Sequence, residues 1–172
     1  KLYAKWELGK KSYRVNHYIQ EVRLGENYEL AESENFIGTA GEMVAPEVKT
    51  YEGFTSPEKQ YYELQVSDDM EVFNYYYQRN SYNVTIDRNN GSENITLEPA
   101  YESKIEYRPE KMGYQFAGWY LDKELKQEFG GTVPAKDLTL YAKWEAQDVS
   151  YSVRHYLQNA NDDGCTSAGT ES

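Results

Sequence analysis

The sequence predicts an α+β fold that is mostly β and is arranged as two small modules in tandem. Separated segments recur at one common spacing, which is typical of arrays of supersecondary units. Short alternating runs rich in Tyr, Val and Thr predict β-strands. Clusters of Gly, Asn, Asp and Pro between these runs predict turns. Together these features predict bead-like modules, each with several strands and one short helix.

The sequence repeat has a period of 138 residues. Leu2–Glu7 (LYAKWE) returns as Leu140–Glu145, and Ser12–Gln20 returns in similar form as Ser150–Gln158. Both matches have the same offset (140 − 2 and 151 − 13), with no insertion between them. A tandem array is therefore predicted, and this chain contains little more than one period of it.

A weaker match divides the period in two. Ser12–Val15 is answered by Ser81–Val84, at an offset of 69 residues (82 − 13). Modules of about 65–70 residues lie near the lower size limit for folding without disulfides or metals. The predicted division is residues 1–11 as the closing strand of a preceding repeat, 12–80 as the first module, 81–146 as the second module, and 147–172 as the opening fragment of a third.

The first module begins with Tyr13–Gln20, which alternates and predicts a strand. The turn residues Gly25–Asn27 separate it from a second predicted strand at Tyr28–Leu30. Ser56-Pro57 has the N-cap and N1 residue types that predict the start of a helical turn. The aromatic run Glu71–Tyr77 predicts the closing strand.

The second module opens with the alternating run Tyr82–Asp87, which also predicts a strand. Asn90-Gly91 predicts a hairpin turn, because this pair accepts positive φ angles, and Ile95–Leu97 is the expected return strand. Leu121–Phe129, followed by a Gly-Gly pair, gives the strongest helical pattern in the chain. Thr139–Trp144 is the predicted closing strand.

The composition limits the functions of the chain. Hydrophobic residues make up 39% and aromatic residues 15%, with 18 Tyr, which predicts small cores built from Tyr and Trp. A net charge of −11 argues against a nucleic-acid surface, because binding to phosphates depends on Lys and Arg. The single cysteine, Cys165, excludes an internal disulfide, so the modules must be stable through packing alone.

Two segments carry a resemblance to a known family. Tyr114–Tyr120 (YQFAGWY), followed by Leu138–Trp144 (LTLYAKW), resembles the Listeria–Bacteroides repeat, the internalin B-repeat family, over residues 81–144. Residues 12–80 are similar to a mucin-binding-protein-type repeat. That similarity rests on the segments His17–Gln20, Tyr51–Phe54 and Tyr75–Asn80.

These resemblances imply small modules of the ubiquitin-like β-grasp kind in a bacterial surface protein. Such modules stand between a binding head and a cell-wall anchor, so the resemblance implies an extracellular, non-enzymatic stalk or spacer region used in adhesion. Its expected partners are neighbouring repeats of the same chain. The alternatives are a module that binds a host glycan or glycoprotein through exposed Tyr and Trp, and an accessory region of a secreted enzyme.

The sequence offers no clear catalytic or metal-binding constellation. His17 and His155 occupy the same repeat position, which favours a packing or hydrogen-bonding role over catalysis. Asn161–Gly164 and Ser67–Asp69 resemble fragments of calcium loops but lack the ligand spacing of an EF-hand. We therefore expect no catalytic residue, no metal site and no cofactor. A Lys–Asn isopeptide crosslink would need a buried Lys, Asn and acid together, which a sequence cannot show.

Aromatic side chains are the best candidates for ligand contact. Tyr76, Trp119 and Tyr120 are the candidate residues. Because alternate residues of a strand face opposite sides, Tyr75 and Tyr77 should share one face and Tyr76 should take the other. For the three tryptophans, burial in a small core is expected more often than ligand contact. Trp6 and Trp144 stand at equivalent closing positions, where they are expected to fill a core or an intermodule contact.

Two predicted strands lack a module of their own. Leu2–Trp6 and Tyr151–Leu157 should therefore pair with the edge of a neighbouring module or with another chain, because an unpaired edge is an association site.

Overall fold

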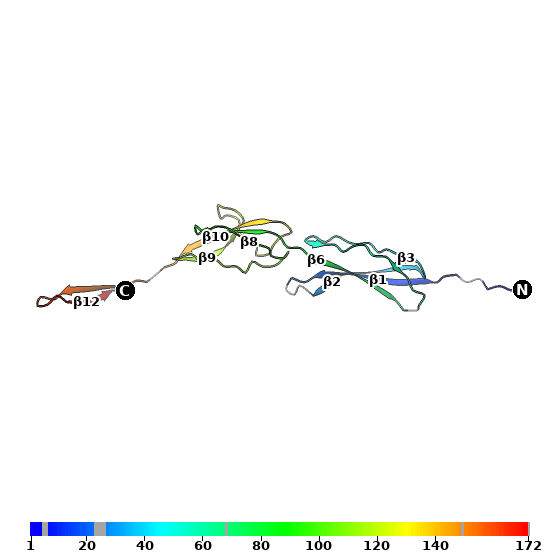
Figure 1. The fold of residues 1–172 in the computed structure, drawn as a ribbon, viewed down its shortest axis with the longest axis horizontal. Helices are drawn as coiled ribbons and strands as arrows, with labels where there is room; N and C mark the ends of the chain where they lie inside the picture. The colour runs from blue at the N-terminus through cyan, green and yellow to red at the C-terminus, as the bar shows by residue number, and fades with distance from the viewer. Residues whose placement is uncertain (5–6, 23–26, 68, 149, 172) are drawn as a thin grey trace.

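The computed structural model describes residues 1–4, 7–22, 27–67, 69–148 and 150–171. In these residues it contains twelve β-strands and no helix, and two larger sheets lie end to end along the long axis (Figure 1). The strands are β1 (Lys10–Gln20), β2 (Tyr28–Thr39), β3 (Met43–Val44), β4 (Phe54–Thr55), β5 (Tyr62–Glu63), β6 (Glu71–Arg79), β7 (Val84–Asp87), β8 (Ile95–Leu97), β9 (Tyr114–Tyr120), β10 (Leu138–Ala146), β11 (Val153–Gln158) and β12 (Cys165–Glu171). The mostly-β part of the predicted fold class is thus confirmed.

The first sheet has the strand order β2-β1-β6-β4. β1 forms an antiparallel hairpin with β2 and lies parallel to β6, with Tyr13 opposite Glu71 and Ile19 opposite Tyr77. A parallel pair needs a long crossover connection, which is usually helical. Here the chain between β2 and β6 crosses over as extended segments and the short strands β3, β4 and β5. This crossover closes the inner face of the sheet.

The core of the first sheet follows from the alternation of its strands. Tyr13 and Val15 of β1 and Tyr75 and Tyr77 of β6 point inward, and Leu64 of the crossover covers them. Their alternate neighbours, such as Tyr76, point outward. The prediction that Tyr76 and its two neighbours would take opposite faces is confirmed.

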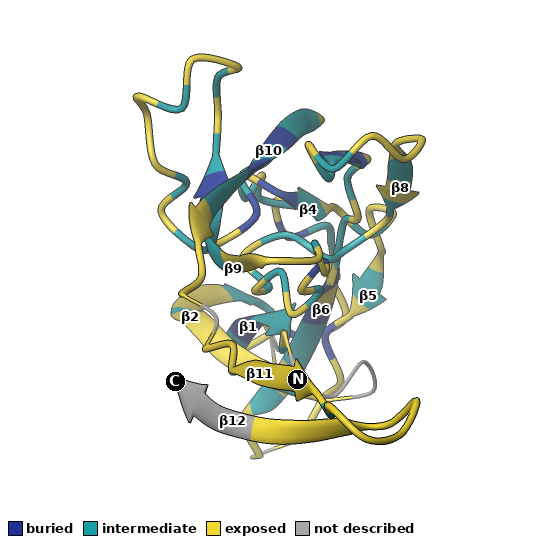
Figure 2. Cartoon of the chain, turned by 90° about the vertical axis from the view of Figure 1, so that its left-hand side faces the viewer, coloured by how far each residue is buried: buried dark blue, intermediate teal, exposed yellow. Residues whose placement is uncertain are grey.

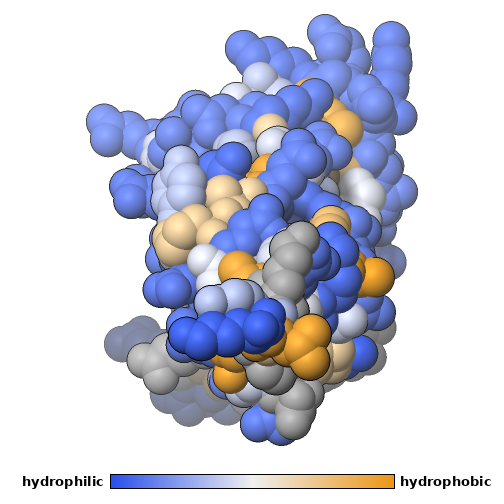
Figure 3. All heavy atoms as spheres, turned by 90° about the vertical axis from the view of Figure 1, so that its right-hand side faces the viewer, coloured by the Kyte–Doolittle hydropathy of each residue, from blue (hydrophilic) through white to orange (hydrophobic). Residues whose placement is uncertain are grey.

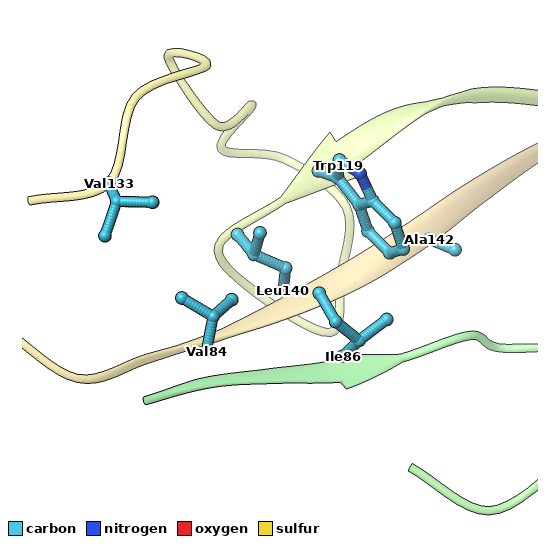
Figure 4. Close-up of a cluster of buried hydrophobic side chains, with 6 residues drawn as sticks. All are labelled: Val84, Ile86, Trp119, Val133, Leu140 and Ala142. Carbon is cyan, nitrogen blue, oxygen red and sulfur yellow. The ribbon is translucent and has the colours of Figure 1, made fainter. Parts of the chain in front are cut away.

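The second sheet repeats this arrangement with the order β8-β7-β10-β9. β7 forms a hairpin with β8 and a parallel pair with β10, and β9 adds an antiparallel strand. Val15 and Val84, which correspond in the half-period, are 1% and 0% exposed on the central strand of their sheets. The weak half-period match therefore corresponds to a shared topology. The core consists of Val84, Ile86, Trp119, Val133, Leu140 and Ala142 (Figure 4).

The predicted helices are wrong within the described residues. Leu121–Phe129 is a compact loop in which the Asp122 carboxylate accepts the N–H of Gln127 at 2.6 Å and Leu125 has a φ of 54°. A side chain that binds the backbone in this way competes with helical hydrogen bonds. Ser56-Pro57 likewise leads into extended chain. The α component of the predicted class is therefore not found, and the β-grasp assignment, which needs a helix across the sheet, is not confirmed.

β11 and β12 form a hairpin whose described side chains are almost all exposed (Figure 2). The bulge between His17 and Tyr18 of the first hairpin recurs between His155 and Tyr156, 138 residues later (155 − 17). The sequence repeat is thus also a repeat of a backbone irregularity. The predicted strand at Tyr151–Leu157 does pair, but with the next strand of its own fragment rather than with another module.

The other predicted orphan strand, Leu2–Trp6, does not form a strand in its described part. Residues 1–4 are extended, and Leu2 and Tyr3 are exposed. Their counterparts in β10, Leu140 and Tyr141, are paired with β7 and β9. Trp6 lies outside the described residues.

Candidate functional site

Three tyrosines form an aromatic cluster on the outer face of the first sheet. Tyr18 of β1 lies opposite Tyr76 of the parallel strand β6, and Tyr28 of β2 reaches Tyr76 from the other side of β1. The Tyr18 and Tyr76 rings are stacked with centroids 5.3 Å apart, and Tyr28 meets Tyr76 edge-on at 5.1 Å. Offset-stacked and edge-on rings are the favourable aromatic geometries. Because Tyr76 is 48% exposed, this tyrosine face offers an accessible platform.

A polar row runs beside the tyrosine face, one alternation along the same strands. The Asn16 amide donates to Asn74 Oδ1 at 3.0 Å, and the Ser33 hydroxyl donates to Asn16 Oδ1 at 2.8 Å. These bonds fix the orientation of the two amides. Asn16 is buried and its amide is engaged in these bonds, whereas Asn74 is half-buried. An aromatic platform can stack on the apolar face of a sugar ring while the neighbouring Asn74 amide binds one of its hydroxyl groups.

The structure separates the three residues that the sequence offered for ligand contact. Tyr76 lies in the tyrosine face, whereas Trp119 and Tyr120 belong to the other sheet. Trp119 is only 8% exposed and packs edge-on against Phe116 at 4.9 Å, so its ring is core rather than display. Tyr120 is half-buried and accepts a hydrogen bond from Lys143 Nζ at 3.2 Å.

Sequence reasoning missed Tyr18 and Tyr28 as partners of Tyr76. The recurrence of Tyr18 as Tyr156 marks a repeated position but not its neighbours. Pairing depends on the register of β1 with two other strands, including the bulge before Tyr18, and a bulge is not visible in the sequence pattern. Trp144 is half-buried and its indole N–H donates to the Arg88 carbonyl at 2.9 Å, in line with the expected packing role.

His17 lies on the inner side of the same sheet and is completely buried. Its Nδ1 is 2.8 Å from the Tyr77 hydroxyl, and its Nε2 is 3.6 Å from a carboxylate oxygen of Glu34. Burial, followed by the positive charge of Lys49, lowers the pKa of His17. A neutral, enclosed ring of this kind fits the packing and hydrogen-bonding role that its recurrence predicted.

Lys49 links two acids at the edge of this cluster. Its ammonium lies 2.5 Å from Glu32 and 2.8 Å from Glu34. Burial by itself would lower the pKa of Lys49, but the hydrogen bonds and charges of the two carboxylates raise it. Burial and the negative charge of Glu32 raise the pKa of Tyr51 to about 12. The ion pairs hold β2 against the crossover segment.

The side chains considered for metal binding and for a crosslink form hydrogen bonds and ion pairs within the fold. In the Asn161–Gly164 turn, Asp162 accepts the backbone N–H of Gly164 at 2.7 Å. Buried Lys11 donates to the Ser67 carbonyl at 2.8 Å and lies 3.5 Å from Glu71, so its ammonium is bound by Ser67 and Glu71 rather than by an Asn. Over the described ranges, no group of three His, Cys, Asp or Glu side chains is arranged to hold a metal ion.

The fold defines the chain as a tandem segment of small β-sheet modules with a shared topology. Residues 82–143 match the family model of the Listeria-Bacteroides repeat domain. This match confirms the resemblance of the second module to that family.

Two proteins of Evansella cellulosilytica are similar to most of the chain. One, named "Putative Gly-rich membrane protein", is 33% identical over 156 residues, which cover 84% of this chain and 17% of that protein. The other, named "Putative membrane protein", is 29% identical over 162 residues, covering 88% of this chain and 23% of that protein. The chain thus spans about a fifth of the length of these relatives. In the described part of the chain, no helix is long and apolar enough to cross a bilayer.

Proposed function

We propose that this chain is a non-enzymatic spacer segment of a bacterial cell-surface protein, located outside the cell and anchored to the wall through other regions. The match to a repeat family and the names of the two relatives as membrane proteins support this proposal. The first module is proposed as a mucin-binding-protein-type repeat. Both modules are proposed as β-grasp-like sheets in which extended chain replaces the crossing helix.

The observation that carries the spacer proposal is the joint between the two modules. Arg79, the last residue of β6, has a side chain that is 4% exposed. Its guanidinium donates to the Gln20 carbonyl at 2.9 Å in the first module. In the second module, it donates to the Tyr101 carbonyl at 3.1 Å and to Glu102 at 2.7 Å. One side chain therefore clamps both modules.

Backbone contacts reinforce this joint. Asn80 donates its N–H to the Gly53 carbonyl at 2.9 Å, and its own carbonyl accepts the N–H of Tyr101 at 2.8 Å. The Tyr101 ring meets Phe54 edge-on with centroids 5.9 Å apart and lies directly against the Cα of Gly53. A joint with hydrogen bonds to both modules holds them in a fixed relative orientation, as a stiff spacer requires.

Measuring the relative motion of the modules tests the spacer proposal. In the wild-type chain, ¹⁵N relaxation should give both modules one common rotational diffusion tensor. In Arg79→Ala, the modules should tumble with separate tensors while both retain their amide chemical-shift dispersion. Independent tumbling in the wild-type chain would refute a stiff spacer. Arg88→Ala, a change of the same residue type away from the joint, is the matched control.

We also propose a second function, glycan or glycoprotein binding by the tyrosine face, because Tyr18, Tyr28 and Tyr76 combine exposure with oriented amides. Glycan-array and mucin-binding measurements test it. Tyr76→Ala should abolish binding, whereas Tyr61→Ala, which removes a 67% exposed tyrosine elsewhere in the first module, should not. Equal binding by both variants would exclude this face as the site.

A further inference from the structure

The joint between the second module of one unit and the first module of the next passes through one position of the repeat, and this chain contains that position twice. Gly9 and Gln147 occupy the same position of the repeat (147 − 9 = 138). Gly9 precedes a complete first module, and Gln147 follows a complete second module. Each copy therefore shows one half of the same joint.

The half seen at Gln147 is bonded to the module before it. Its N–H donates to the carbonyl of Gly113 at 3.0 Å, in the turn that leads into β9. This bond continues the pairing of β10 with β9, whose last matched residues are Ala146 and Tyr114. The second module thus extends to the N–H of this repeat position.

The half seen at Gly9 is bonded to the module after it. Its carbonyl accepts the N–H of Ala40 at 3.0 Å, in the turn that follows β2. β1 begins at the next residue, Lys10, which lies opposite Thr39. The first module therefore begins at the carbonyl of the same repeat position.

Where one residue of the array makes both bonds, no free linker separates a second module from a complete first module; in this chain the next opening strand, β11, begins only at Val153. The N–H of this residue belongs to the module before it, and its C=O belongs to the module after it. The N and O atoms of one residue are at most about 3.6 Å apart. With the two hydrogen bonds of 3.0 Å each, the Gly113 carbonyl and the Ala40 amide lie within about 10 Å of each other.

The two surfaces that this spacing brings together carry apolar side chains. Beside Gly113, Met112 is 98% exposed, at the rim of a groove of about 570 Å³ that also includes Tyr114. On the other side, the 78% exposed Val66 and the buried Ala40 line a hollow of about 270 Å³, whose other lining residues are Gly9, Lys10, Lys11 and Ser67. At the N-terminal end of the molecule, which faces the viewer in Figure 3, hydrophobic residues come to the surface among hydrophilic ones.

We propose that the groove beside Met112 is an interaction surface for the first module of the next repeat unit, with Met112 seated against Ala40 and Val66. The repeat spacing fixes this occupant, because only the position of Gly9 and Gln147 separates the end of β10 from the position at which a complete first module begins β1. The inference rests on the proposed spacer function. It adds that the joints between units, like the Arg79 joint within a unit, are in direct contact.

Crosslinking in a two-unit chain tests this interface. Residues 1–147 are followed directly by residues 10–172 of a second copy, with Cys165→Ser throughout. Met112→Cys in the first copy and Val66→Cys in the second should form a disulfide, because the Cα atoms must approach within about 7 Å for the bond to form. Lys123→Cys in place of Met112→Cys is the control, since residue 123 follows the opposite end of β9.

We expect the Met112–Val66 pair to crosslink at least about ten-fold faster than the control pair, because the interface raises their effective concentration. Equal rates would overturn the interface. Methionine oxidation provides a second measurement without cysteines: one of the two Met112 residues should be protected in the two-unit chain. Oxidation of both at the rate of the single-unit chain would also overturn it. Independent tumbling about Arg79, by contrast, would refute the spacer and leave this interface standing.

Discussion

Replacing Tyr77 with Phe should expose how much the buried hydroxyl contributes to the first module. The hydroxyl accepts the backbone N–H of Lys49 at 2.9 Å. It is then free to donate its own proton to His17 Nδ1 at 2.8 Å, which leaves the His17 proton on Nε2. In this tautomer, Nε2 presents an N–H rather than a lone pair to the Glu34 carboxylate, 3.6 Å away.

The magnitude follows from the groups that the substitution leaves without partners. The ring packing, including the edge-on contact with Tyr51 at 4.8 Å, is retained in Phe. Tyr77 is fully buried, so the Lys49 N–H and His17 Nδ1 both lose their partner in a site with little water. A buried polar group left unpaired costs about 1–3 kcal/mol. Two such groups predict a loss of about 2–6 kcal/mol in the free energy of unfolding.

Urea denaturation of Tyr77→Phe measures this loss. The m-value should stay unchanged, because the surface exposed on unfolding is the same. Tyr76→Phe is the matched control: it removes a hydroxyl from the adjacent, 48% exposed residue and should change stability by less than about 0.5 kcal/mol. If the two variants lose equal stability, the hydroxyl of Tyr77 does not support the core as we describe.

Two further predictions concern pH and the joint. Because burial lowers the pKa of His17, the unfolded chain takes up the proton first, so stability should fall as pH drops through the unfolded value of about 6.5. Thermal unfolding at pH 7.5 and pH 5.5 measures this loss; His155→Gln should preserve it, and a flat profile would contradict the assignment. Gly53→Ala places a Cβ 2.2 Å from the Tyr101 ring at a φ of 79°, and should cost about 1–3 kcal/mol and loosen the joint. Gly91→Ala has a similar φ of 86° with no atom within 4 Å, so in urea denaturation it should lose less; an equal loss would exclude the Tyr101 contact as the cause.

The joints between modules are the physical basis of the spacer proposal, because they determine the stiffness of the array. In a serial array, stability and stiffness are sums of module and nearest-neighbour terms. Arg79 supplies such a term within a unit, and the position shared by Gly9 and Gln147 is proposed to supply the other. An array with both kinds of joint would project a distal region without a flexible linker.

Much of the strand layout could be read from the sequence. The alternation of Glu71–Tyr77 correctly placed Tyr75 and Tyr77 on one face and Tyr76 on the other, because successive side chains of a strand point to opposite faces whatever the strand pairs with. The strand and turn pattern of Tyr82–Leu97 was recovered for the same local reason. The 138-residue period found in the sequence also separates the two backbone bulges, which precede Tyr18 and Tyr156.

The tertiary structure alone decided what these local elements meet. The helical pattern of Leu121–Phe129 yields to the bond between the Asp122 carboxylate and the backbone, in a segment too short to be a stable helix by itself. The tyrosine face depends on the register of three strands, and the clamp at Arg79 depends on carbonyls of residues 20 and 101. Periodicity fixes the direction of a side chain relative to its own backbone. Its partners across the sheet are set by long-range pairing, about which the local pattern holds no information.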